Sequence, residues 1–125
     1  YEQVDIVAGT CLSDIMIRQE SFENIILDNF TSITLENNMK PDALLNHNAS
    51  KQAGEIVVTF PQRTTSLLDW AKENGLSVRG HTLVWYSQTP DWIYYEDFDT
   101  SKEFVDRDTM LERMESFIMQ VFEHL

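Results

Sequence analysis

The spacing of apolar residues changes along the chain, and each change marks an expected element. Residues 4–10 are short and β-branched, a pattern that predicts a strand. Apolar side chains then recur at helical spacing and predict a helix over about residues 19–29. A second short strand is predicted over residues 32–36.

The middle of the chain is less regular. Residues 41–50 are polar and are interpreted as a loop, and residues 55–60 have β character within a connection that precedes a helix. That helix is expected over about residues 64–74, with Gly75 as its left-handed cap. A third strand is predicted over residues 77–85.

A one-sided apolar stripe then predicts a long final helix. Its members recur from Met110 to Leu125, and Asp106 is the candidate N-cap. The predicted order alternates strand and helix three times, with connections long enough for parallel strands. This α/β order fits either three units of a closed (β/α)8 barrel, incomplete in this chain, or a small open sheet with helices on both faces.

Composition narrows the possible partners. Nine Lys and Arg residues against 21 Asp and Glu residues give a net charge of −12, which disfavours nucleic acid and anionic membranes as partners. With 42% hydrophobic residues, the 125-residue chain can fill a core. Cys11 is the single cysteine, and no Cys/His set has metal-ligand spacing, so neither an internal disulfide nor a metal is expected.

Strand parity separates a polar face from an apolar face. In the second predicted strand Glu36 lies on the polar face, opposite Ile33 and Leu35, and in the third His81 and Trp85 lie on the polar face. These polar and aromatic residues gather toward the carboxyl ends of the strands, where parallel α/β folds bind ligands. A carboxylate, an imidazole and an indole there suit a polar ligand with a flat apolar face, such as a sugar ring.

Two segments carry a family likeness. Glu36-Asn37-Asn38-Met39-Lys40-Pro41 resembles the E-N-x-M-K-P segment of glycoside hydrolase family 10, the endo-1,4-β-xylanases. Residues 79–92 resemble the R-G-H-T-L-x-W-H-S-Q-x-P-x-W segment of the same family. The resemblance spans nearly the whole chain and implies that residues 1–125 form the N-terminal part of a catalytic (β/α)8 barrel.

The resemblance also implies an activity, the retaining hydrolysis of xylan by a glutamate pair, with no cofactor. It implies six substrate-binding side chains in this sequence: Glu36, Asn37, Lys40, His81, Trp85 and Gln88. By this likeness the first three hydrogen-bond a xylose at the second subsite on the glycone side. His81 contacts the sugar at the cleavage point, Trp85 lines that subsite, and Gln88 adds a hydrogen bond nearby.

Two departures from the family pattern matter. Tyr86 stands where the family usually has His, which is expected to alter one active-site hydrogen bond. The W-D-x-x-N-E and T-E-x-D motifs, which carry the acid/base and the nucleophile, are absent from the 125 residues. Because retaining hydrolysis needs two carboxyl groups about 5 Å apart, no catalytic residue is assigned here, and the isolated chain is expected to be inactive.

The expected substrate is therefore xylan or a xylo-oligosaccharide, and the expected location is extracellular, as for a secreted hydrolase of plant cell walls. The rest of the barrel would lie on a longer form of this chain or on a second polypeptide. Two alternatives stay open: a non-catalytic xylan-binding piece and a purely structural half-barrel without a ligand. Titration with xylobiose separates these alternatives, because only the binding piece should respond.

Overall fold

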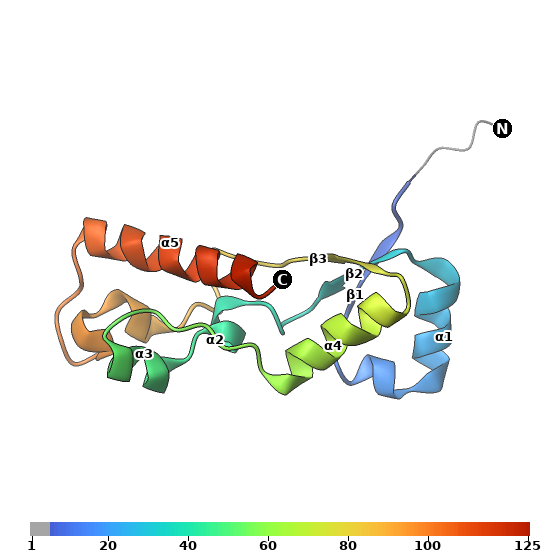
Figure 1. Cartoon of the computed structure of the whole chain (residues 1–125), viewed down its shortest axis with the longest axis horizontal. Coiled ribbons are helices and arrows are strands. Elements are labelled where there is room, and N and C mark those ends of the chain that lie inside the picture. Colours follow the sequence, from blue (N-terminus) through green and yellow to red (C-terminus); the bar gives the residue numbers. More distant parts are fainter. Residues whose placement is uncertain (1–5) are drawn as a thin grey trace. The chain divides into compact units, whose positions relative to one another are not determined.

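A computed structural model describes residues 6–125 of the chain. These residues divide into two units, and each is described by itself. The first contains the chain up to Met39 together with Gln62–His81, and the second contains Lys40–Pro61 and Thr82–Leu125. Figure 1 labels their helices and strands.

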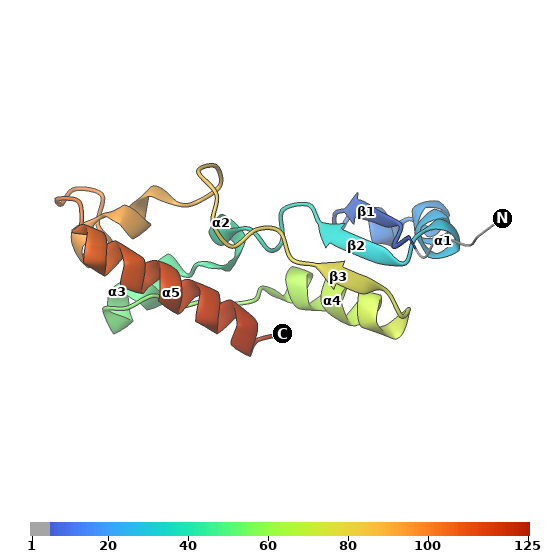
Figure 2. The same cartoon turned by 90° about the horizontal axis from the view of Figure 1, so that it is seen from above.

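A parallel sheet forms the centre of the first unit. Its strands are β1 (Gly9–Leu12), β2 (Ser32–Leu35) and β3 (Ser77–Arg79), with β2 in the middle (Figure 2). Both strand pairs are parallel, as the long connections in the sequence predict. The second predicted strand is confirmed to within one residue.

The two outer strands differ from their predictions. The strand expected over 4–10 begins at Gly9 instead, and positions 4 and 5 lie outside the described residues. The strand expected over 77–85 ends at Arg79. The register aligns Thr34 with Arg79, and β2 ends one residue later, so residues beyond 80 have no facing residues on β2 with which to pair.

Burial on β2 follows the predicted alternation. Ile33 and Leu35 are fully buried, whereas Ser32 and Thr34 on the opposite face are half-buried. On β3, Val78 pairs with Ile33 but is less buried than its predicted apolar face implies, with 37% of its surface exposed. Among the described residues β3 is an edge strand, so it pairs with β2 along one edge and no strand pairs with its other edge.

Two predicted helices are confirmed in the first unit, α1 (Glu20–Asn29) and α4 (Gln62–Glu73). A short 3-10 helix, η1 (Met16–Arg18), precedes α1. The indole Nε1 of Trp70 on α4 donates a hydrogen bond of 2.8 Å to Glu23 Oε1 on α1. Gly75 follows α4 with φ +68°, the left-handed conformation expected of it.

The predicted loop over 41–50 is wrong, because the second unit forms α2 (Pro41–Leu44) and α3 (His47–Ala53) there. Pro41 occupies the first turn of α2, a position where its missing N–H costs nothing. The Asn46 side chain caps α3 by accepting from the Ala49 N–H at 3.1 Å. The polar residues that indicated a loop include this cap and the solvent side of a short helix.

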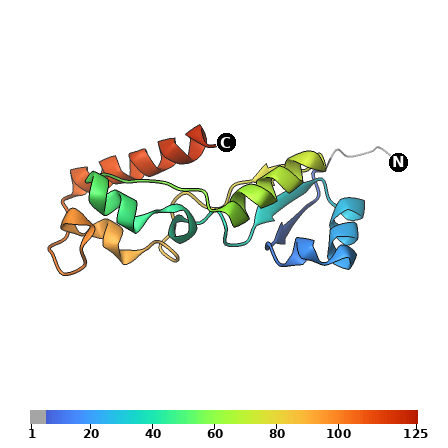
Figure 3. The ribbon, with the colours of Figure 1, turned by 60° about the horizontal axis from the view of Figure 1, so that its bottom comes forward.

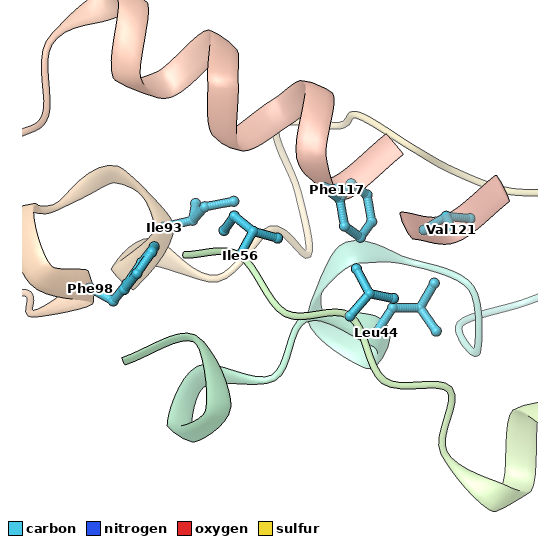
Figure 4. Packing of buried hydrophobic residues seen from close by; sticks show 7 residues of the cluster. Leu44, Ile56, Ile93, Phe98, Phe117 and Val121 are labelled. Atoms are coloured by element: carbon cyan, nitrogen blue, oxygen red, sulfur yellow. The ribbon is translucent and has the colours of Figure 1, made fainter. Parts of the chain in front are cut away.

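The core of the second unit joins residues that are distant in sequence. Its buried cluster, of which Figure 4 labels six members, contains Leu44, Ile56, Val58, Ile93, Phe98, Phe117 and Val121. Two of these lie in the segment 55–60, which forms no strand and makes only an isolated antiparallel bridge between Val58 and Leu45. The Gln120 amide replaces a strand partner by accepting from Val58 N–H at 2.9 Å and donating to Ile56 O at 2.7 Å.

The final helix is confirmed as α5 (Arg107–Glu123), drawn in red in Figure 3, and its predicted cap is also confirmed. The apolar stripe is buried only in part, because Phe117 and Val121 are buried whereas Leu111 and Phe122 are exposed and Leu125 lies beyond the helix. Asp106 accepts from the Thr109 N–H at 2.8 Å. Arg113 on α5 donates to Ile93 O at 2.6 Å and Tyr95 O at 2.9 Å, which ties α5 to η2 (Asp91–Tyr94) and to the residue that precedes η3 (Glu96–Phe98). Burial lowers the pKa of Arg113 from its ordinary value.

No helix in the described part of the chain combines the length and apolarity needed to cross a membrane.

Candidate functional site

Three of the six predicted site residues meet in the second unit. The ammonium group of Lys40 donates a hydrogen bond of 2.5 Å to Gln88 Oε1. The same Nζ lies 5.0 Å from the centroid of the Trp85 ring, within the range of a cation–π interaction. Lys40 is 7% exposed, so its charge is held close to these two neutral partners.

Backbone contacts hold this cluster in place. Lys40 is extended because Pro41 follows it, and the Asp42 N–H donates to Gln88 O at 3.0 Å. Gln88 has φ +54°, a left-handed conformation that costs free energy for a residue with a side chain. The tie to the Asp42 N–H keeps Gln88 against the segment that carries Lys40.

Thr89 is a positioning residue that the sequence analysis missed. Its hydroxyl donates a hydrogen bond of 2.6 Å to the carbonyl oxygen of Trp85. This hydrogen bond closes the short turn that connects Trp85 with Gln88. Thr89 occupies a variable position of the quoted motif, so only a search for side-chain-to-backbone turns could have found it.

The other three predicted site residues belong to the first unit. Glu36 and Asn37 are exposed and directly follow β2, and His81 is half-buried two residues after β3. The Glu36 N–H donates to Leu12 O at 2.9 Å, which fixes the backbone where the carboxyl ends of β1 and β2 meet. These groups therefore follow the carboxyl ends of parallel strands, the position that the parity argument expects.

Buried neighbours support the segment after β2. Asn38 and Met39 are each 5% exposed, and the Thr64 hydroxyl on α4 donates to Asn38 O at 3.0 Å. Thr64 is fully buried and was also missed by sequence reasoning, which treated its helix only as packing. Because α4 fixes the backbone at Asn38, it also limits the directions open to Asn37.

The ring of Trp85 borders further aromatic and apolar surface. Tyr86, the residue that departs from the family pattern, is 92% exposed, and its ring lies edge-on to Trp85 with centroids 5.7 Å apart. A cavity of about 220 Å³ also touches Trp85 and is lined mostly by apolar side chains, among them Leu83, Ile93 and Met114. Within residues 6–125, no cluster of His, Cys, Asp and Glu is arranged to hold a metal ion.

Comparison with known proteins identifies the family. A sequence profile described as glycosyl hydrolase family 10 matches residues 1–125. The chain belongs to this family. Endo-1,4-beta-xylanase Y of Acetivibrio thermocellus is 38% identical over 117 residues, which cover 94% of this chain and 11% of that protein. A bifunctional endo-1,4-beta-xylanase of Ruminococcus flavefaciens is 42% identical over 98 residues, which cover 77% of this chain and 10% of that protein.

Solved structures of family 10 enzymes have the same fold. The N-terminal endo-1,4-beta-D-xylanase 10B of Clostridium thermocellum, complexed with xylohexaose, matches with a TM-score of 0.85 and 39% identity over 93% of this chain and 22% of that one. An intracellular xylanase of Thermoanaerobacterium saccharolyticum, complexed with xylotetraose, matches with a TM-score of 0.74 and 29% identity over 93% of this chain and 33% of that one.

These matches identify the fold class as the (β/α)8 barrel, of which the parallel three-stranded sheet is a part. The chain spans about a tenth of the length of the two curated relatives.

Proposed function

We propose that this chain contributes glycone-side sugar-binding groups to an endo-1,4-β-xylanase that hydrolyses xylan with retention. The observation that carries the proposal is the Lys40–Trp85–Gln88 cluster, in which residues from both family motifs meet within the second unit. Membership of family 10 and relatives named as endo-1,4-beta-xylanases support it. A similar structure holds xylohexaose, an oligomer of the expected sugar.

The chemistry of the cluster fits a xylose ring. An ammonium group donates to hydroxyl oxygens, the Gln88 amide both donates and accepts, and the Trp85 indole offers a flat surface to the apolar face of the ring. At the end of β2, the Glu36 carboxylate adds a hydrogen-bond acceptor, and the Asn37 amide can both donate and accept. His81 supplies an imidazole after β3 for the sugar next to the cleavage point.

We further propose that the catalytic carboxylates lie outside residues 1–125, because neither glutamate motif of the family occurs in them. Retaining hydrolysis needs one carboxyl group as acid/base and a second as nucleophile, and Glu36 alone cannot fill both roles. The remaining barrel, on the same polypeptide or on a second one, would supply them. A location outside the cell is part of this proposal, although one similar xylanase is intracellular.

Titration of the 125-residue chain with xylobiose tests the binding proposal. We expect saturable binding that Lys40→Met and Trp85→Ala both weaken, because each removes a group of the cluster. Lys72→Met is the matched control, since Lys72 is an exposed lysine in the last turn of α4. If xylobiose fails to bind the unaltered chain, the purely structural alternative replaces the proposal.

An assay of xylan hydrolysis tests the proposal that the catalytic carboxylates lie outside residues 1–125. We expect no hydrolysis by the 125-residue chain and hydrolysis when the remaining barrel is supplied. Sustained release of xylo-oligosaccharides by the chain alone, verified by intact mass, would contradict the placement of the carboxylates. Binding without hydrolysis even in the completed barrel would instead favour the non-catalytic xylan-binding alternative.

A further inference from the structure

A second cavity, of about 320 Å³, lies in the first unit. One wall follows β1 and includes Asp14 and Arg18, and the other is the beginning of α4, with Gln62, Arg63 and Ser66. Leu67, which is fully buried, contributes apolar surface to the lining. The volume suits a single sugar ring or a ligand of similar size.

Residues close in sequence to both walls are hydrogen-bonded to the chain segment that follows β2. Asp14 lies two residues after Leu12, whose carbonyl oxygen accepts from the Glu36 N–H at 2.9 Å. On the other wall Thr64, next to Arg63, donates its hydroxyl to Asn38 O at 3.0 Å. Neighbours of the cavity lining are therefore hydrogen-bonded to residues 36 and 38, on either side of Asn37, and residues 36 and 37 carry two of the proposed sugar-binding side chains.

The lining of this cavity has more basic than acidic side chains, whereas the whole chain is acidic. Acidic residues outnumber basic ones by 21 to 9, yet two arginines line this one cavity. Arg18 Nη2 pairs with Asp14 Oδ2 at 3.3 Å, whereas Arg63 has no ion-pair partner among residues 6–125. An arginine in this setting can form two parallel hydrogen bonds to a ligand carboxylate.

The remaining lining groups suit a sugar more than a bare anion. The Asp14 carboxylate accepts from hydroxyl groups, and the Gln62 amide and Ser66 hydroxyl can both donate and accept. The Asp14 carboxylate would also repel a simple anion. A negatively charged ligand that binds here therefore needs hydroxyl groups that can donate to Asp14. A pyranose ring that carries a carboxylate meets both requirements.

We propose that this cavity binds a uronic acid unit, so that the protein prefers acidic xylan chains bearing a carboxylated sugar. The inference rests on the proposed function, which it deepens by naming the substrate class. Arg63 holds the carboxylate, Arg18 adds positive charge, and Asp14, Gln62 and Ser66 hydrogen-bond the ring hydroxyls. The main chain of the xylan binds to Glu36 and Asn37, the residues that follow β2.

The test compares a neutral xylotetraose with a xylotetraose that carries one glucuronic acid branch. The acidic oligosaccharide is expected to bind about threefold to tenfold more tightly, as for a charge-assisted hydrogen bond at a partly exposed site. Arg63→Gln should abolish this preference and leave the affinity for the neutral oligosaccharide unchanged. Lys72→Gln, at the other end of α4, is the control and should preserve the preference.

Asp14→Asn gives a readout that a purely structural role would not produce. Because it removes a repelling carboxylate and keeps a polar side chain, it should increase the preference for the acidic oligosaccharide. Equal binding of the two oligosaccharides by the unaltered chain, or a preference that survives Arg63→Gln, would overturn the inference.

Free glucuronate separates this inference from the proposed function. Glucuronate is expected to bind more tightly than glucose, with an affinity that decreases in Arg63→Gln. If this result holds while neutral xylotetraose does not bind, the proposed xylan function fails and the uronic acid site stands. Inorganic phosphate that binds as tightly as glucuronate would contradict a sugar site.

Discussion

The Nζ of Lys40 lies 2.5 Å from the Oε1 of Gln88, a residue 48 positions later in the chain. The backbone repeats this contact, because the Asp42 N–H donates to Gln88 O at 3.0 Å. Each partner comes from a different family motif. These two contacts therefore bring the end of the first motif against the second half of the other within the second unit.

Replacing Gln88 with glycine should separate binding from stability. Gln88 has φ +54°, and glycine adopts this conformation without the usual penalty of about 1–2 kcal/mol. We therefore expect Gln88→Gly to unfold at the same or a higher temperature than the unaltered chain. It should bind xylobiose more weakly, because it loses the side-chain amide that bonds to Lys40. Thermal denaturation and titration measure the two effects.

Gln88→Ala is the matched control for this pair of measurements. It removes the same amide but retains the unfavourable conformation, so its affinity should resemble that of the glycine variant while its melting temperature is lower. Affinity retained by both variants would show that the Gln88 side chain does not contribute to binding.

Thr89→Val should weaken binding without unfolding the protein. The substitution keeps the side-chain shape and removes the hydroxyl that donates to Trp85 O at 2.6 Å. We expect a loss of about 1 kcal/mol in the affinity for xylobiose, because the turn that orients the indole becomes looser. Thr89→Ser retains the hydroxyl and should bind like the unaltered chain. The contact has no positioning role if serine and valine weaken binding equally.

Much of the first unit could be predicted because its sequence patterns are local. Helix α1 follows from apolar spacing, the turn after α4 from Gly75, and the buried face of β2 from the alternation of Ile33 and Leu35. The length of β3 could not be predicted. Strand length depends on where the partner strand ends, and Arg79 pairs only because β2 reaches Thr34.

The errors in the second unit have a similar origin. Asn46 favours a loop by composition but caps α3 in the structure, and Ile56 and Val58 alternate like a strand while bonding to the Gln120 side chain. Motif likeness brought Lys40, Trp85 and Gln88 into the site, but it could not assign Thr89. Its contribution is a contact to the backbone, which no residue pattern in the motif records.

Two phenylalanines on α5 test the buried face of this helix. Phe117 is 3% exposed and belongs to the core cluster, whereas Phe122 is 62% exposed. Phe117→Ala should lower the free energy of unfolding by about 3–5 kcal/mol, and Phe122→Ala by less than about 0.5 kcal/mol. Urea denaturation of the 125-residue chain measures both values. Equal losses would mean that α5 presents a different face to the core.

The cap of α5 should make stability depend on pH. The backbone N–H of Thr109, together with its side chain, bonds the Asp106 carboxylate and holds its pKa below the ordinary value of 3.8. A lowered pKa in the folded state stabilises the protein above the pKa of the unfolded chain. This contribution is lost as the pH falls through the folded pKa.

Comparison with Asp106→Asn isolates this contribution, because asparagine can cap the helix without titrating. The unaltered chain should be the more stable of the two at pH 7, and the difference should shrink below about pH 4. Asp108→Asn supplies the control, since Asp108 is a second aspartate in the first turn of α5 and is not the cap. This variant should retain the pH dependence that Asp106 contributes. A stability difference between the unaltered chain and Asp106→Asn that keeps its full size below about pH 4 would show that the lowered pKa of Asp106 does not contribute.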